Sequence, residues 1–256
     1  MLRPAIQPLA APRELFASRI RLPDDAATTL HVARFDRATV RARVVRLPPR
    51  LPLRSWCTAA GVDDAIVGGF FVRPEGTPLG DLRIGGMTMR TVPFDSPWDE
   101  RRSCVHIDGG RIALASRDEL EAMPAGDLLQ AGPMLVRDAA NCAAAGHDPE
   151  GFSAGSRQFD SDITVGRYPR AALALTPSDV LAVVCDGRTD ADAGLTLSEL
   201  AAALVDLGAE QAINLDGGGS ASLVFDGRLR NRPHEEHGVP LPVGRPIATA
   251  ITFSSR

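Results

Sequence analysis

Residues 212–225 read AINLDGGGSASLVF, and this stretch organises the interpretation of the whole chain. Apolar residues lead to an acid, three glycines follow, and a second β-rich run ends the stretch. This order predicts a strand, a tight glycine turn and another strand. Asn214 and Asp216 are two residues apart, so their side chains would point to the same face of a strand.

Gly217, Gly218 and Gly219 leave no side chain beside the acid, which permits left-handed backbone angles and close approach of a ligand. Their successive amides could form an anion-binding concavity. A plain Asp-Gly hairpin needs only one or two glycines, so the third favours a binding site over a turn. In that site the hydroxyl or backbone of Ser220 would bind the ligand, since no GxSxG context supports a serine nucleophile.

Composition is that of a globular protein: 256 residues, 44% hydrophobic and 23% charged, with a formal net charge of −4. The negative charge argues against general affinity for nucleic acid or acidic membranes. The chain contains no lysine, so all 28 basic residues are arginine. Any anion site must therefore be built from arginine guanidinium groups, which bind phosphate bidentately.

The four cysteines form no CxxC pair, which argues against a zinc site or a disulfide framework. Residues 1–19 contain no uninterrupted apolar run typical of a signal peptide. No apolar run approaches the length of a membrane-spanning helix. The sequence thus predicts a soluble, cytoplasmic protein.

The chain pattern predicts one α+β domain with mixed β-sheets, several hairpins and a few flanking helices. Residues 1–25 are interpreted as a leader and residues 26–256 as the domain. Strands are predicted at residues 29–35, 40–46, 64–72, 103–107, 111–115, 171–176, 180–185, 211–215 and 247–253. The first two are expected to pair with each other.

The clearest helix is predicted at residues 196–207, where Thr196 and Glu199 fit a capping box and Gly208 ends the apolar periodicity. Asp186 and Arg188 follow the strand before this helix, and Asp216 follows the strand after it. If the two strands are parallel neighbours, both ends open on one edge, where ligands bind in such units.

Several motifs, in order, support a resemblance. They are AIVGGFF at residues 65–71, GPMLV at 132–136, PRAALAL at 169–175, DGRT at 186–189, NLDGGGSAS at 214–222, NRP at 231–233 and RP at 245–246. Together they resemble the phosphodiester glycosidase family, which hydrolyses the bond between a sugar's anomeric carbon and a phosphodiester. The match spans residues 65–251.

The resemblance implies that Asp216 acts at the anomeric centre, as a nucleophile or as a stabiliser of an oxocarbenium-like state. Asp186 and Glu199 are further catalytic candidates, although the capping box favours a helix cap for Glu199. The candidate phosphate ligands are Arg170, Arg188 and Arg245. Other candidate substrate-binding residues are Gly69, Asn214, Gly217, Gly218, Gly219, Ser220 and Asn231.

Two departures from the family pattern motivate an alternative. Val67 stands where the family usually has asparagine and Ala171 where it has threonine, which would remove polar groups from a pocket. A sugar-phosphate-binding protein without catalysis is therefore the second hypothesis. A third is a divergent enzyme of specialised metabolism that acts on a cytosolic glycosyl-phosphate compound.

We expect a small-molecule or glycan substrate that bears a sugar phosphate, and no nucleic acid or membrane partner. No cofactor is expected. No metal is expected either, because the HEEH run at residues 234–237 is not HExxH and lies in a proline-flanked loop. The sequence carries no signal for an oligomeric state.

Overall fold

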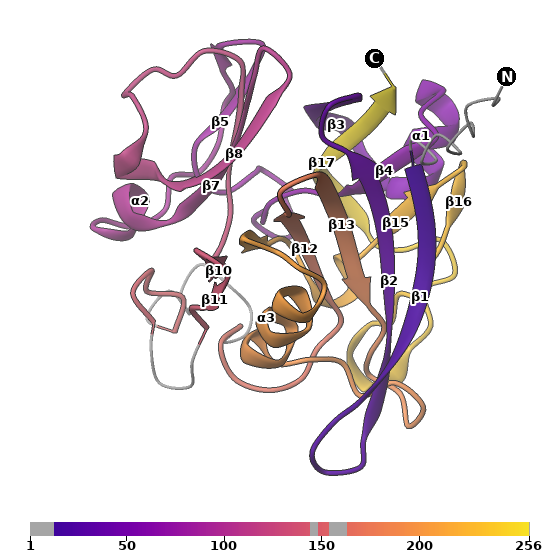
Figure 1. The fold of residues 1–256 in the computed structure, drawn as a ribbon. Coiled ribbons are helices and arrows are strands. Elements are labelled where there is room, and N and C mark those ends of the chain that lie inside the picture. The colour runs from indigo at the N-terminus through magenta and orange to yellow at the C-terminus, as the bar shows by residue number, and fades with distance from the viewer. Residues whose placement is uncertain (1–12, 144–147, 154–162, 256) are drawn as a thin grey trace, which may run out of the picture.

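The computed structural model describes residues 13–143, 148–153 and 163–255, and it shows an α+β fold with three antiparallel sheets (Figure 1). The central sheet has the order β1 (Arg13–Arg21), β2 (Ala27–Asp36), β13 (Asp179–Cys185), β12 (Arg170–Leu175), β14 (Gln211–Asn214), β10 (Met134–Arg137) and β11 (Ala140–Asn141). The predicted fold class is confirmed.

Two five-stranded sheets complete the fold. The second sheet has the order β16 (Arg228–Leu229), β15 (Leu223–Phe225), β4 (Asp64–Val67), β17 (Pro246–Ser255) and β3 (Val40–Pro52). The third has the order β6 (Met87–Thr88), β5 (Leu82–Ile84), β9 (Asp127–Gln130), β7 (Ser103–Asp108) and β8 (Arg111–Ser116). The helices are α1 (Leu53–Ala60), α2 (Trp98–Arg101) and α3 (Leu197–Asp206), with 3-10 turns at Arg117–Glu119, Gly218–Ser220 and Glu236–Gly238.

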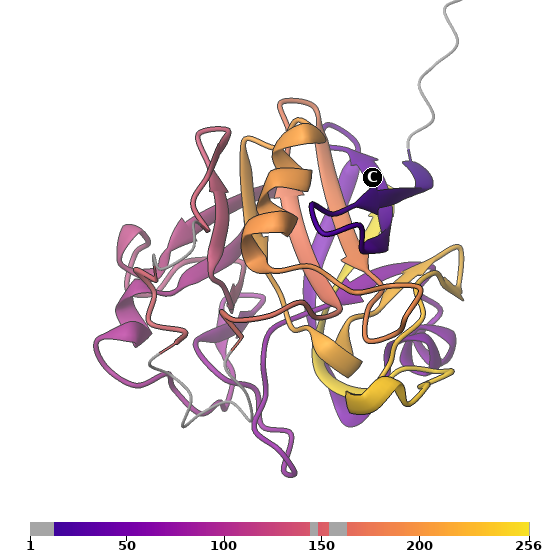
Figure 2. The same cartoon turned by 90° about the horizontal axis from the view of Figure 1, so that it is seen from below.

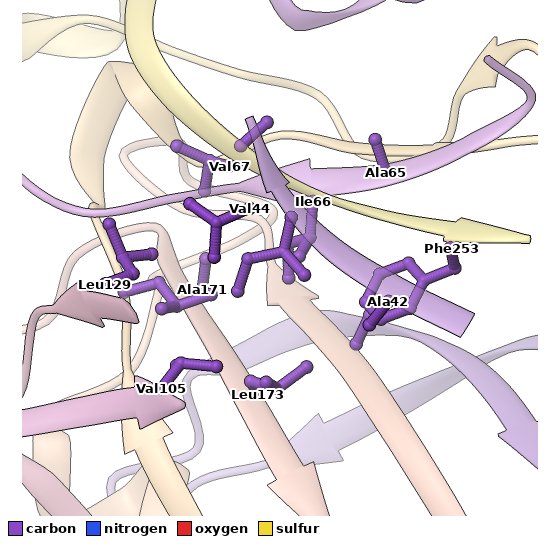
Figure 3. Packing of buried hydrophobic residues seen from close by; sticks show 14 of the residues in the cluster. Ala42, Val44, Ala65, Ile66, Val67, Val105, Leu129, Ala171, Leu173 and Phe253 are labelled. Carbon is purple, nitrogen blue, oxygen red and sulfur yellow. The ribbon is translucent and has the colours of Figure 1, made fainter. Parts of the chain in front are cut away.

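The central sheet is covered on both faces, and its middle strands are mostly apolar. Along β12, Ala171 and Leu173 belong to the core shared with the second sheet, whereas Ala172 and Ala174 belong to the core under α3. This alternation is the two-residue period of a strand. Figures 1 and 2 both show α3 against the central sheet, and Figure 3 shows Leu173 in the core between the sheets.

Local sequence signals account for α3. Thr196 accepts a hydrogen bond from the Glu199 N–H, and Glu199 accepts one from the Thr196 N–H, so the predicted capping box is present. Leu200 and Leu204 are fully buried against the central sheet. Gly208, at φ +84°, follows the last turn of the helix.

Two expectations about strand pairing and the chain start are corrected. β2 and β3 do not pair with each other: β2 pairs with β1 and β13, and β3 pairs with β17. The alternating arginines of β3, Arg41 and Arg43, are exposed, and Arg43 donates to Asp127 of β9 in the third sheet. Arg13–Arg21, within the segment interpreted as a leader, form β1, so the central sheet starts before residue 26.

The glycine stretch is a crossover between sheets. β14 belongs to the central sheet and β15 to the second sheet, so residues 215–222 carry the chain from one to the other. A hairpin would have placed both strands in one sheet. Among the described residues, no helix is long and apolar enough to span a membrane.

Candidate active site

A cavity of about 390 Å³ opens where the central sheet meets the second sheet. Its lining residues are Phe70, Phe71, Val72, Arg73, Leu79, Val92, Ile163, Tyr168, Arg170, Arg188, Asn214, Leu215, Asp216, Gly217, Gly218, Glu236 and Arg245. The carboxyl ends of β13 and β14 both reach it. These two strands run parallel but are not neighbours, because β12 lies between them and is antiparallel to both.

The family-like motifs meet around the crossover segment. The Gly68 carbonyl accepts the Asp216 N–H at 3.0 Å, and the Pro169 carbonyl accepts the Gly218 N–H at 2.8 Å. Asn214 exchanges hydrogen bonds with the GPMLV segment, since its side-chain amide donates to the Gly132 carbonyl at 3.0 Å. Motifs that are far apart in sequence therefore fix one short stretch of backbone.

Asp216 is partly accessible from the cavity but closely surrounded by protein. Burial raises its pKa to about 6, against the opposing effects of Ser220, Arg245, the Gly217 amide and Arg73. The Gly217 N–H donates to its Oδ1 at 2.9 Å. A carboxyl group with a pKa near neutrality in a cleft is typical of a functional site.

Four arginines line the same cavity: Arg73, Arg170, Arg188 and Arg245. Arg170 is buried, and its guanidinium donates to the carbonyls of Leu195 and Gly166. Backbone acceptors therefore fix its orientation.

Arg188 has a left-handed backbone with φ +65°, which is strained for a residue other than glycine. It donates to the His234 carbonyl at 3.2 Å. Burial lowers its pKa, the carboxylates of Glu235 and Glu236 act in the opposite direction, and Arg245 adds to the lowering. The protein thus holds several cations close together, which favours binding of an anion.

A carboxylate already lies among these cations. Glu235 is ion-paired with Arg245, whose Nε donates to Glu235 Oε2 at 3.2 Å, and Glu235 Oε1 lies 3.8 Å from Arg73. Arg73 and Arg245 therefore share one anionic group supplied by the chain.

Each of the three glycines accommodates a different neighbour. A Cβ at Gly217 would lie 2.9 Å from the Pro169 carbonyl oxygen, and one at Gly219 would lie 2.3 Å from Glu235. Gly218 has φ +57°, a conformation that favours glycine. The amides of Gly217 and Gly218 and that of Ser220 already donate within the protein. This segment is not an open amide nest, contrary to the expectation from sequence.

Two buried polar groups near the cavity have no hydrogen-bond partner among the described residues. Asn214 is buried, and its Oδ1 has no partner among the described residues. The second group is the Ser220 hydroxyl. It lies close enough to the Asp216 carboxyl to lower the pKa of that group, but the geometry is not that of a hydrogen bond. Asn214 lines the cavity and offers an acceptor to a hydroxyl group; Ser220 is fully buried behind it.

Asp186, Asn231 and Gly69 do not line the cavity. Asp186 is buried, with its carboxylate 2.8 Å from His31 Nε2 and 2.6 Å from the Arg232 N–H. His31 of β2 is therefore the side-chain partner of Asp186. Asn231 binds the Leu223 N–H and the Ala221 carbonyl, and the Gly69 N–H donates to the Thr249 hydroxyl. All three position the chain behind the site.

Glu199 is also outside the cavity lining. Its carboxylate caps α3 and forms a two-pronged contact with Arg167, with distances of 2.6–3.1 Å. Burial tends to raise its pKa, but Arg167 and Thr196 outweigh burial and hold the pKa below its usual range. The structure therefore places this candidate at a helix terminus.

We expect Glu199→Ala to lower the free energy of unfolding by about 1 kcal/mol, because the cap and its ion pair are lost. Catalytic rate should stay within about twofold of the wild type. Denaturant titration and initial-rate measurement check both values, and Glu199→Gln, which keeps the cap, should lose less stability. A large loss of rate with little loss of stability would restore Glu199 as a catalytic candidate.

Val67 and Ala171 are core positions. Both are fully buried in the cluster between the central and second sheets, and Figure 3 shows them among Val44 and Leu129. Neither lines the cavity. The suggestion that they remove polar groups from a pocket is therefore not supported by their location.

Sequence reasoning missed Arg73, Tyr168, Glu235, Glu236 and the apolar lining. Arg73 could have been suspected because it lies two residues after the AIVGGFF motif. Glu235 and Glu236 lie in the HEEH run, whose residues were weighed as metal ligands and not as partners of the arginines. Among the described residues, no group of three His, Cys, Asp or Glu side chains is arranged to hold a metal ion.

Comparisons with known proteins agree with this architecture. A family model described as phosphodiester glycosidase matches residues 60–254. No curated protein matches the sequence significantly. The catalytic domain of zebrafish N-acetylglucosamine-1-phosphodiester α-N-acetylglucosaminidase, auto-inhibited by its pro-peptide, is similar with a TM-score of 0.71 at 21% identity, covering 98% of this chain and 86% of that one.

Two bacterial structures are also similar in fold. A hypothetical protein from Synechocystis has a TM-score of 0.66 at 16% identity, covering 96% of this chain and 62% of that one. A putative exported protein from Burkholderia pseudomallei has a TM-score of 0.64 at 16% identity, covering 90% of this chain and 74% of that one. At these identities the likeness shows the fold alone.

Proposed function

The chain belongs to the phosphodiester glycosidase family, and from this premise we propose that it hydrolyses the glycosidic bond of a sugar-1-phosphodiester or a related glycosyl phosphate. One observation carries the proposal: the Asp216 carboxylate shares a cavity with four arginines. A carboxylate stabilises positive charge at an anomeric carbon, and arginines bind the phosphate attached to it.

The roles follow from charge and position. With a pKa of about 6, Asp216 is mostly ionised at pH 7 and is available as a nucleophile or as a stabiliser of the oxocarbenium-like state. Arg188 and Arg245 would bind the phosphate. Each well-placed donor contributes on the order of a few kcal/mol when negative charge develops on the leaving group. Because a phosphodiester leaves readily, a strong general acid is less necessary.

The orientation of the sugar is inferred from the remaining polar groups. Asn214 Oδ1 is buried in the cavity lining and would accept a hydrogen bond from a sugar hydroxyl. It lies two residues before Asp216, so the sugar ring would lie near both. The name of the zebrafish relative supports N-acetylglucosamine-1-phosphodiesters as the first compounds to test.

A hydrolysis panel tests the proposal. We expect turnover of at least one compound among α- and β-linked sugar-1-phosphodiesters and nucleotide sugars, measured by release of the reducing sugar. Arg188→Ala should raise KM by about 10-fold or more, because a charge-assisted contact to phosphate is lost. Arg232→Ala, which alters an exposed arginine outside the cavity lining, is the matched control. Absence of turnover across the panel would refute the hydrolase proposal.

The alternative, a sugar-phosphate-binding protein without catalysis, loses its sequence argument because Val67 and Ala171 are core residues. It keeps a distinct signature. Calorimetry would then show saturable binding of a sugar phosphodiester that the protein does not turn over.

A further inference from the structure

The residues that line the cavity include two chemically different groups, which we call the charged wall and the apolar wall. The charged wall consists of Arg170, Arg188, Asp216 and Arg245. The apolar wall consists of Phe70, Phe71, Val72, Leu79, Val92 and Ile163. Five of the six apolar residues come from the single segment 70–92, which follows β4, so this wall is one local structure.

The apolar wall is fixed by its backbone. The Leu79 N–H donates to the Phe70 carbonyl at 2.9 Å, and the Val72 N–H donates to the Thr77 carbonyl at 2.9 Å. The Val92 N–H donates to the Pro78 carbonyl at 2.9 Å. A surface held in this way loses little conformational entropy when a ligand covers it.

The wall is also supported from behind. Phe70 and Leu79 are 5% and 2% exposed and pack in a cluster with Phe94 and Phe152. On the cavity side, Val92 is 37% exposed, and Phe71 and Val72 are half-buried. Apolar side chains therefore remain open to the cavity, where an apolar ligand group would remove them from water.

Charge fixes the place of a phosphate between the walls. Arg73 directly follows Val72 of the apolar wall, and it lies 3.8 Å from Glu235, the partner of Arg245 on the charged wall. Arg73 and Arg245 thus both lie beside one anionic group, and both line the cavity. A phosphodiester that took the place of the Glu235 carboxylate would lie in a cavity lined both by Asp216 and by the apolar residues.

We propose that the second ester group of such a phosphodiester is apolar, so that the substrate is a glycosyl phosphodiester with an alkyl or aryl aglycone seated on the apolar wall. The inference rests on the proposed function. Water adds to the anomeric carbon as the bond from that carbon to the phosphate oxygen breaks. The products are the free sugar and the alkyl or aryl phosphate, and the proton lost by water is released to the phosphate or to solvent.

The test is a homologous series with one sugar, one anomeric linkage and methyl, butyl or hexyl as the aglycone. A fully buried methylene changes affinity by about fourfold, and one covered on a single side by about twofold. Five added methylenes should therefore raise kcat/KM about 30-fold from the methyl to the hexyl ester. A glycerol ester is the polar control and should resemble the methyl ester.

The Val92→Asp variant should reduce the hexyl-to-methyl ratio to a few-fold, because a charged group replaces exposed apolar surface. Met87→Asp introduces the same charge on β6, at a side chain 66% exposed and outside the cavity lining, and should keep the wild-type ratio. Using the ratio removes any uniform effect of the new charge on phosphate binding. A Val92→Asp ratio equal to that of the wild type would overturn the assignment of the wall.

A second readout separates this inference from the proposed function. Calorimetry with methyl, butyl and hexyl phosphate measures how affinity depends on the length of the alkyl chain, without any turnover. Hydrolysis with no dependence on chain length, or with preference for glycerol, would overturn the apolar aglycone and leave the hydrolase proposal intact. Chain-length-dependent binding without hydrolysis of any diester would overturn the hydrolase and leave the apolar subsite. Absence of both would overturn both.

Discussion

Replacement of Asp216 by asparagine is expected to lower kcat/KM for the best phosphodiester of the panel by about 10³-fold or more. The amide keeps the size of the side chain but removes the negative charge that stabilises the transition state at the anomeric carbon. In the wild type, the rate should rise with pH through about 6 as Asp216 loses its proton. Initial rates between pH 4 and pH 8 check the profile, and the residual rate of the variant should lack this rise.

The same substitution should stabilise the protein at neutral pH. The folded state raises the pKa of Asp216 from 3.8 to about 6, so it binds the proton more tightly than the unfolded state does. Stability is therefore lost as pH rises through this interval, with a cost of about 1–3 kcal/mol once the group is ionised. Asp216→Asn should be more stable than the wild type by about this amount at pH 8 and nearly equal to it at pH 4.

Thermal unfolding at both pH values measures this difference. A variant that is inactive and also less stable at pH 8 would contradict the assignment, because the loss of activity would then follow from misfolding. A buried charged group that serves activity commonly lowers the stability of the folded state.

Arg102→Ala should be among the most destabilising substitutions in the chain. Arg102 is fully buried, and its guanidinium carbon lies 4.1 and 4.2 Å from the ring centroids of Phe94 and Phe152. Its guanidinium donates to the carbonyls of Glu150 and Gly151 at 3.2 and 3.0 Å. Removal leaves a cavity, two carbonyls without their donor, and the buried Glu150 carboxyl without the opposing charge.

The expected cost is about 3–5 kcal/mol, or a fall in melting temperature of about 10 °C for a domain of this size. Chemical denaturation checks the free energy and calorimetry the temperature. Arg101→Ala alters the exposed residue before Arg102, at the end of α2, and should change stability by less than about 0.5 kcal/mol. A loss under 1 kcal/mol for Arg102→Ala would mean that the contacts of Arg102 with the two rings contribute little to stability.

Local signals in the sequence predicted α3 and several strands of the central sheet. The capping box at Thr196 and Glu199 and the apolar runs of β12 and β13 each depend on neighbours in sequence, and the structure contains all of them. The pairing of β3 failed because alternation shows which face of a strand is buried but not which strand lies beside it. β1 was missed because prolines and arginines precede it and its burial pattern is irregular.

For the candidate site, the sequence indicated which charged residues would lie together. Asp216, Arg188 and Arg245 share one cavity, as expected. The sequence indicated Asp186 as a catalytic candidate and Asn231 as a substrate-binding candidate. Both side chains bind backbone groups of other segments: Asp186 accepts from the Arg232 N–H, 46 residues away, and Asn231 donates to the Ala221 carbonyl, 10 residues away. Sequence alone does not reveal such partners. The apolar wall was missed for the same reason: Val92 and Phe71 resemble ordinary core residues until the fold leaves them facing a cavity.

The crossover at Gly217–Gly219 has a consequence for engineering. Gly217 lies against the Pro169 backbone carbonyl and Gly218 has a left-handed φ of +57°, so substitution at either position would strain the backbone. The side chains of Phe71 and Val92 instead line the cavity, and the backbone hydrogen bonds of their segment do not involve these side chains. A combinatorial library restricted to these two positions would keep the fold and the charged wall while it samples new aglycones. The apolar wall is therefore the part of the cavity at which we expect substitution to be tolerated.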